Sequence, residues 1–445
     1  MSDDSSEWMK LLRELFGDRA EEALDEMRRM GVDPAQLAAA TGVDASPGML
    51  DHLLSQLRAV MAQSAGEDVN WNLAHDVARG VAAQGGDPTV SASTAADHRA
   101  AVSTAELWLD AATDFAPSTL TPRVWSHAEW VEATLPTWRT LAGPVAVSVS
   151  RALGALLARE RDAGGTLLGQ ISPTVCGMHV GQAAGAMARE AFGGTDLGLP
   201  LLPEPQVALV PRSISEFAEG LDVPADEVRS FLALRECAHV RLFKHSPWLQ
   251  GQLHVAIERY ASGVSIDLDA LDEAVHQAGM GDPDTLQKAL SKGIFATAHT
   301  DDQRTMLEAI ETMLALIEGW VDDVTAQAAV PHVPHLGQLR EMMRRRRAAG
   351  GPAEHTFATL LGLELRPRRL RDAVDLWTAL RVAGGSSGRD APWAHPDLLP
   401  GPGDLGQWAD WVAARGPGSS DDDVDRELRE MLGEGSGGPS GPKTD

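Results

Sequence analysis

Five residues of this chain, Arg235-Glu236-Cys237-Ala238-His239, have the spacing of a zinc-binding helix without its first ligand. In the H-E-x-x-H pattern, two histidines one turn apart bind zinc, and the intervening glutamate activates water as a general base. Glu236 and His239 stand at the required spacing, but Arg235 takes the position of the first histidine. A guanidinium stays protonated and has no lone pair for a metal. The motif therefore indicates zinc chemistry while lacking one of its ligands.

Helical geometry places the three polar residues of this motif on one side. With 3.6 residues per turn, position 239 lies about 40° round the axis from position 235 and about 60° from position 236. Arg235, Glu236 and His239 therefore point broadly the same way. An E-x-x-H pair occurs by chance in many helices, so a metal site needs further ligands from another segment.

A second segment supplies candidates for these ligands. Glu318 and Asp322 form an E-x-x-x-D pattern on a helix predicted over 301–328. Zinc sites of the thermolysin type combine two histidines with one glutamate, and a nearby carboxylate orients a ligand histidine. We therefore predict His239 and Glu318 as metal ligands, Glu236 as the catalytic base, and Asp322 and Arg235 as neighbours of the ligands. The alternative is that Glu318 and Asp322 form an ordinary pair on a solvated helix face.

His245 is a rival third ligand. It stands where the pattern H-E-x-x-H-x-x-G-x-x-H has its last histidine, but Leu242 replaces the glycine that turns the chain back. On a continuing helix, position 245 is rotated about 240° from His239 and cannot share a metal with it. We expect His245 to be a helix-end histidine. Other loose candidates, each expected to be structural, are His179, His254 and His355.

Composition limits the classes of partner. The chain has 445 residues, with 38 Lys and Arg against 64 Asp and Glu, for a net charge of −26. Nucleic acid and anionic membranes favour basic proteins, so neither is an expected partner. The two cysteines, Cys176 and Cys237, do not suggest a disulfide framework. The acidic N-terminus does not resemble a secretory signal, and we expect a cytoplasmic protein.

Residue patterning predicts a mainly α-helical fold with little strand. Ala, Leu, Arg and Glu dominate, alternating runs are scarce, and the best strand candidate is 207–210. We expect an N-terminal helical segment and linker at 1–66, a folded body at 67–405, and an acidic, mostly disordered tail at 406–445. No phosphate-binding loop, dinucleotide fingerprint or nucleophilic serine turn is present, so we predict no organic cofactor.

Two further patterns favour structural explanations. Gly177, Gly181 and Gly185 recur every fourth residue, and their polar neighbours favour close packing of two helices over a membrane dimer. The arginine run at 344–347 is expected to be a solvated helix face that pairs with the acidic surface.

The amino-acid sequence resembles that of a known family over roughly residues 69–402. The distinctive phrases are A-L-R-E-C-A-H at 233–239, I-E-G-W-V-D at 317–322 and W-A-H-P-D-L-L-P at 393–400. They are similar to an actinobacterial family of zincin-like, metalloprotease-like hydrolases, of which a sister branch is associated with coenzyme F420 biosynthesis. The resemblance implies a mostly helical zincin-related fold, with Glu236 as the general base and His239 as a zinc ligand. The sister branch carries a full H-E-x-x-H, whereas the branch that this chain resembles reads arginine at the first position.

Two functions follow as expectations. The first is a zinc-dependent metallopeptidase-like hydrolase with an altered ligand set, acting on a peptide or protein substrate. The second is a catalytically inactive zincin-fold protein that binds a partner or serves as a scaffold. In that alternative, Arg235 replaces the metal and pairs with Glu318.

Overall fold

The computed structural model describes residues 68–159, 164–196, 198–262, 300–348 and 369–414. The N-terminal helical segment expected at 1–66 lies outside these ranges, as does His355. Residues 406–414 belong to the segment expected to be a tail, and among them Trp411 is buried.

The described chain is mainly helical, which confirms the predicted fold class. The bounds of its α-helices are α5 (Trp71–Ala82), α6 (Ala92–Leu109), α7 (His127–Arg159), α8 (Gly164–Ala188), α9 (Pro211–Glu219), α10 (Ala225–His245), α11 (Pro247–Ser262), α14 (Asp301–Ala329), α15 (Leu336–Ala348), α17 (Leu370–Asp390), α18 (Pro402–Leu405) and α19 (Trp408–Ala413). Two short 3₁₀ helices, η2 (Ala391–Ala394) and η3 (Pro396–Leu398), follow α17.

Two short strands complete the described part of the fold. β1 (Arg123–Val124) pairs in parallel with β2 (Ala208–Leu209), so the predicted strand at 207–210 is confirmed. An isolated antiparallel bridge joins Gly193 to Leu209. The segment that begins at Gly193 is therefore held beside β2, just before α9 begins at Pro211.

Local sequence signals explain several helix ends. The Thr300 side chain accepts a hydrogen bond from the Gln303 N–H, and the Gln303 side chain accepts one from the Thr300 N–H, which forms a capping box at the start of α14. Proline disfavours helical backbone in the residue before it, so Pro247 ends α10 at Ser246. The end of α17 is less regular, because Gly385 has a φ of +69° inside it and turns the last residues in a new direction.

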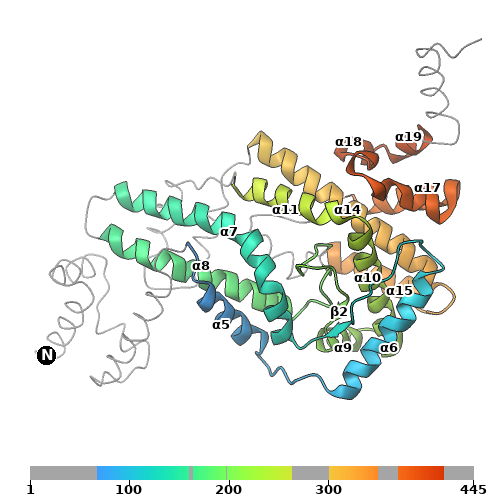
Figure 1. Ribbon diagram of the computed structural model, residues 1–445, viewed down its shortest axis with the longest axis horizontal. Coiled ribbons are helices and arrows are strands. Elements are labelled where there is room, and N and C mark those ends of the chain that lie inside the picture. The colour runs from blue at the N-terminus through green and yellow to red at the C-terminus, as the bar shows by residue number, and fades with distance from the viewer. Residues whose placement is uncertain (1–67, 160–163, 197, 263–299, 349–368, 415–445) are drawn as a thin grey trace, which may run out of the picture.

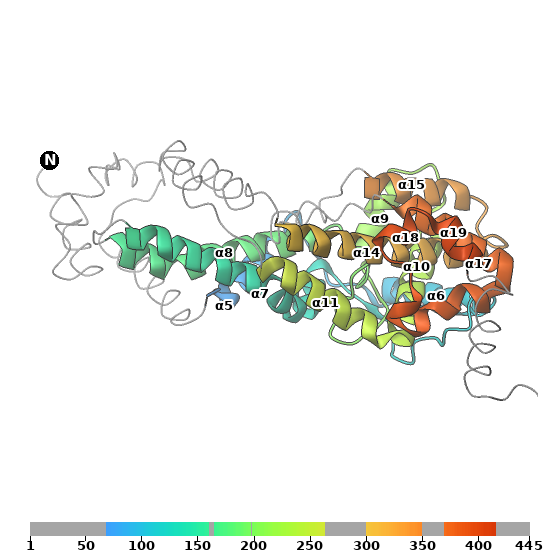
Figure 2. The same cartoon turned by 90° about the horizontal axis from the view of Figure 1, so that it is seen from above.

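Helices α7 and α8 form a long hairpin that projects from the rest of the protein (Figures 1 and 2). Prolines usually interrupt a helix, yet α7 continues to Arg159 with Pro136 and Pro144 inside it. Figure 1 shows α7 bent rather than broken. A proline removes one helical hydrogen bond and bends the axis, while packing against α8 and α5 keeps the helix continuous.

The glycine stripe on α8 allows α5 to approach closely. A Cβ atom on each of these glycines would lie 2.4–2.5 Å from a backbone oxygen of α5 or its cap. The pairs are Gly177 with Asn70, Gly181 with Ala74, and Gly185 with Ala78. The predicted close packing of two helices is confirmed.

Among the described helices, none is long and apolar enough to cross a membrane.

Helix α10 lies at the centre of the core. It packs against α6, α14 and α9, and every residue from Phe231 to Phe243 is buried. α14 is buried from Leu314 to Thr325 and is covered by α17 and α15. Polar side chains on such fully buried helices must find partners inside the protein.

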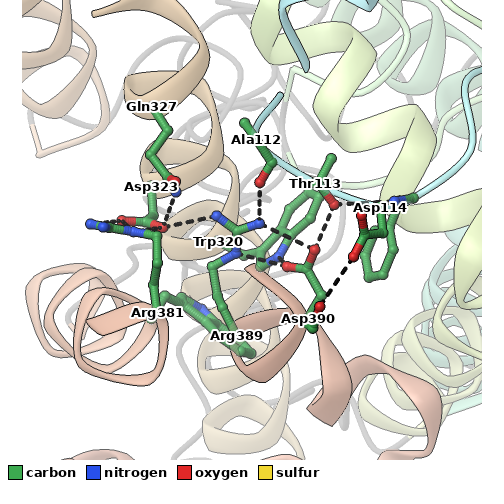
Figure 3. Close-up of polar contacts among 12 residues, drawn as sticks. Ala112, Thr113, Asp114, Trp320, Asp323, Gln327, Arg381, Arg389 and Asp390 are labelled. Atoms are coloured by element: carbon green, nitrogen blue, oxygen red, sulfur yellow. Dashed lines mark hydrogen bonds and ion pairs between the residues drawn. The ribbon is translucent and has the colours of Figure 1, made fainter. Parts of the chain in front are cut away.

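A buried polar network fastens the end of α17 to α14 (Figure 3). Arg389 is 0% exposed and donates to both Asp390 oxygens, to Asp323 and to the Ala112 carbonyl oxygen. Asp390 also accepts hydrogen bonds from the Trp320 indole and the Thr113 hydroxyl. Each of the three guanidinium nitrogens of Arg389 has an acceptor, so this cluster is a satisfied structural tie.

Candidate functional site

Helices α10 and α14 pack against each other and carry all five predicted site residues. α10 contributes Arg235, Glu236 and His239, and α14 contributes Glu318 and Asp322, all of them buried. The structure brings Arg235, His239 and Glu318 into direct contact. Glu236 and Asp322 bind other partners.

Arg235 and Glu318 form a buried ion pair. Nη2 of Arg235 lies 2.6 Å from Oε2 of Glu318, and the two side chains are 6% and 1% exposed. Hydrogen bonds between ionised partners are shorter and stronger than neutral ones. Burial lowers the pKa of Arg235 and Glu318 opposes that change, while a guanidinium remains charged at neutral pH. The pair therefore places a permanent positive charge on the predicted metal-ligand carboxylate.

His239 is held between two acceptors. Its Nδ1 lies 2.8 Å from the carbonyl oxygen of Arg235, and its Nε2 lies 2.9 Å from Oε1 of Glu318. The carbonyl oxygen of Arg235 can only accept, so Nδ1 donates to it, and Nε2 is the ring nitrogen that faces the carboxylate. A histidine that binds a metal through Nε2 must offer it a lone pair, and here that nitrogen is directed at Glu318.

Arg347 brings a second guanidinium to the same carboxylate. Its Nη2 lies 2.8 Å from Oε1 of Glu318 and donates to the carbonyl oxygen of Asp196 at 3.0 Å. Burial alone would raise the pKa of Glu318, but the charges of Arg347, His239 and Arg235 outweigh it and hold that pKa well below its usual range. Glu318 is therefore a firmly ionised centre of the cluster.

The sequence-based interpretation of the arginine run at 344–347 is right for half of it. Arg344 and Arg345 are exposed and pair with Glu341, as expected for a solvated face. Arg346 and Arg347 point inward, because α15 packs on α14 and α10. The Arg346 guanidinium lies 3.9 Å from the Phe192 ring centroid. The spacing of Arg340, buried Met343 and Arg347, at i, i+3 and i+7, was the signal that an inward face existed.

Glu236 faces a different segment. Its carboxylate accepts hydrogen bonds from the Gly194 N–H (2.9 Å), the Thr195 N–H (3.3 Å), the Thr195 hydroxyl (2.6 Å) and the Ala208 N–H (3.3 Å). A Cβ atom on Gly193 would lie 2.5 Å from Oε2, so only glycine fits there. Burial raises the pKa of Glu236, and the bond from Thr195 opposes that shift. Four donors match the four lone-pair sites of a carboxylate, so Glu236 acts here as a tie for residues 193–208.

Asp322 binds Arg340 of α15 in a fork. Arg340 donates from Nε to Oδ1 at 3.1 Å and from Nη2 to Oδ2 at 2.5 Å. The hydrogen bond that Arg340 donates to Asp322 raises the pKa of Arg340. The sequence predicted Asp322 as the group near the ligand histidine. In the structure, the carbonyl oxygen of Arg235 orients the ring of His239 instead. Asp322 therefore anchors α15, the helix that delivers Arg347.

His245 is the last residue of α10, and its ring stacks on Phe115 with centroids 3.7 Å apart. α10 is one uninterrupted helix from Ala225, so positions 239 and 245 face different directions, as the sequence predicted. Among the described residues, no group of three or more His, Cys, Asp or Glu side chains has an arrangement that could hold a metal.

The residues present do not fit a zinc ion. A catalytic zinc site uses three protein ligands, and here His239 and Glu318 are the two predicted ligands that meet. A divalent ion beside Glu318 would also face the charges of Arg235 and Arg347 at contact distance. The two predicted ligands thus meet, and the same carboxylate also contacts Arg235 and Arg347.

Another constellation has the residue types of a hydrolytic triad. His127 Nε2 lies 3.0 Å from Ser213 Oγ, and His127 Nδ1 lies 3.9 Å from Asp87 Oδ1. The second distance is too long for a hydrogen bond. The carboxylate of Asp87 instead accepts the backbone N–H groups of His127 and Ala128 at the start of α7. Ser213 is only 3% exposed. This cluster is a structural tie between α7 and α9.

Comparison with solved structures finds one related fold. It is the crystal structure of a candidate hydrolase with a novel fold from Chloroflexus aurantiacus, at a TM-score of 0.56 and 17% sequence identity. The match covers 78% of this chain and 99% of that one. At this identity the likeness concerns the fold. A search of the curated proteins gives no match.

Comparison with protein families gives a match over most of the chain. The family described as zincin-like metallopeptidase matches residues 69–412, which include both halves of the Glu318 cluster on α10 and α14. The resemblance expected from the sequence is confirmed at the level of this family. This chain therefore belongs to the zincin-like metallopeptidase family.

Proposed function

We propose that this chain works without zinc, as a binding or scaffold module for a peptide or protein partner built on a metallopeptidase scaffold. The single observation that carries the proposal is the buried ion pair between Arg235 and Glu318, 2.6 Å apart. It uses the carboxylate that a zinc ion would need and supplies a positive charge in its place. Breaking this pair would remove one charged donor from a buried carboxylate that keeps Arg347 and His239, at a cost of about 1–3 kcal/mol.

The arrangement of Glu236 supports the same proposal. A general base must have a lone pair free to take a proton from water. The four hydrogen-bond donors to Glu236 come from Gly194, Thr195 and Ala208 and occupy that capacity. Both groups required for zinc-assisted hydrolysis are thus engaged in structural contacts.

A second candidate is a zinc-dependent hydrolase, which membership of a metallopeptidase family favours. In that case zinc would need His239, Glu318 and a further ligand from outside the motif, and Arg235 would have to leave the carboxylate. Glu236 would also have to give up donors to reach water. Each requirement breaks contacts that are present in the buried site.

Metal analysis separates the two candidates. Protein purified without an affinity tag and dialysed against zinc should contain far less than one zinc per chain. A peptide library presented to the same sample should include peptides that bind and are recovered uncut, with and without a chelator. About one zinc per chain, lost on His239→Ala, together with chelator-sensitive cleavage, would establish the hydrolase instead.

A further inference from the structure

Helix α15 contributes to the site a residue that the H-E-x-x-H comparison does not anticipate. Arg347 reaches Glu318 from a third helix and is 13% exposed, and its contact to the Asp196 carbonyl oxygen keeps the guanidinium in place. Arg340, two turns earlier, fastens α15 to α14 through Asp322. Arg347 is therefore a fixed occupant of the site rather than a surface side chain that happens to point inward.

The charges of the two arginines equal that of the absent metal. Zinc carries two positive charges, and Arg235 and Arg347 each carry one at the same carboxylate. Arg235 occupies Oε2, and Arg347 occupies Oε1, the oxygen that also meets His239 Nε2. The second guanidinium thus shares with His239 the oxygen of Glu318 that a zinc ion held by both predicted ligands would also need.

We propose that Arg235 and Arg347 exclude divalent metals independently, so that correcting the motif at position 235 does not by itself restore a zinc site. This inference rests on the proposed zinc-free function and extends it to a residue outside the motif. A histidine at position 235 would complete a two-histidine, one-glutamate ligand set by residue type. Arg347 would still place a positive charge on Oε1, and a cation repels a divalent ion strongly in a buried, poorly screened site.

The test compares zinc binding by four forms of the full chain: wild type, Arg235→His, Arg235→His with Arg347→Met, and Arg235→His with Arg345→Met. Methionine keeps most of the unbranched stem of arginine and removes its charge. Arg345 is the matched control, because it lies on the same helix, is 71% exposed and pairs with Glu341. Zinc content after dialysis and the visible absorption of added cobalt(II), which reports tetrahedral coordination, are the readouts.

We expect wild type to bind no zinc and Arg235→His to bind it weakly, with or without Arg345→Met. The Arg347→Met double variant should bind zinc about 100-fold more tightly than Arg235→His and should show the cobalt absorption. Arg235→His with Arg347→Lys keeps the charge and should remain weak.

Each other outcome has a defined meaning. Stoichiometric zinc in wild type would overturn the proposed function itself. A metal-free wild type whose Arg235→His form binds as tightly as the Arg347→Met double variant would overturn only the role of Arg347. If the double variant unfolds, Arg235→His with Arg347→Gln keeps a hydrogen-bond donor at Glu318, and its failure to gain affinity over Arg235→His would equally refute the inference.

Discussion

Helix α14 holds two buried arginine–carboxylate clusters that differ in how their charges are matched. In the cluster around Arg389, two arginines and two aspartates share the bonds, and Trp320, Thr113 and Gln327 add neutral donors (Figure 3). In the cluster around Glu318, Arg235, Arg347 and His239 all converge on one carboxylate. The first set balances its charge, and the second gathers cationic donors on a single acceptor.

This difference separates a cluster with matched charges from one in which several donors share one carboxylate. A buried ion pair is stable when every charge has a counter-charge and every polar atom a partner. Arg389 meets that condition at all three nitrogens, whereas Nε of Arg347 has no hydrogen-bond partner among the described residues. The two clusters should therefore respond differently to the loss of one arginine.

The largest expected effect is at Arg389. Arg389→Ala leaves Asp323 and Asp390 short of their buried counter-charge, and we expect unfolding free energy to fall by about 3–5 kcal/mol in urea denaturation. Arg235→Ala should cost less, about 1–3 kcal/mol, because Glu318 keeps Arg347 and His239. Equal losses at the two sites would show that the donors of Glu318 are not redundant. Arg381→Ala, at a residue 30% exposed beside Asp323, is the control and should cost about 1 kcal/mol or less.

The next effect is the pH dependence that Glu318 contributes. The folded pKa of Glu318 lies well below its unfolded value, so its stabilising effect is present above about pH 4.3 and is lost as pH falls toward the folded pKa. We expect Glu318→Gln to lose about 3 kcal/mol at pH 7 and to show a flatter loss of stability between about pH 5 and pH 3 than wild type. Thermal unfolding across that range measures both. A variant whose acid profile matches wild type would show that the cationic cluster does not hold Glu318 ionised.

The smallest expected effect is at Thr195. Thr195→Val removes the 2.6 Å hydroxyl donor to Glu236 and keeps the shape of the side chain. We expect a loss of about 1–3 kcal/mol, since one donor to a buried carboxylate disappears and three remain. Thr104→Val, at a partly exposed threonine whose hydroxyl donates to the Ala100 carbonyl oxygen of its own helix, is the matched control and should change stability little. No difference between the two variants would indicate that Glu236 does not depend on residues 193–208.

Much of the fold was predictable because helices are local. The helix predicted over 301–328 matches α14 nearly to the residue, and the glycine spacing predicted the close helix packing that α8 makes with α5. The motif spacing also placed Arg235 and His239 on one face and singled out Glu318 as a partner from a distant helix. The helix bounds and the shared faces follow from the spacing of residues within one segment, and the choice of Glu318 follows from the few residue types that can bind a metal.

The tertiary structure alone decided which partner each polar group received. Arg347 and its exposed neighbour Arg345 are the same residue type in one run, and only the packing of α15 against α14 and α10 sends one inward. The donors of Glu236 lie 28 to 42 residues away along the chain, in a segment held beside β2. The sequence thus determined which residues could take part in a metal site, whereas the close packing of separate helices decided that two guanidinium groups contact the carboxylate of Glu318. A buried charge needs a counter-charge, and the folding of the chain determines which counter-charge lies nearest to it.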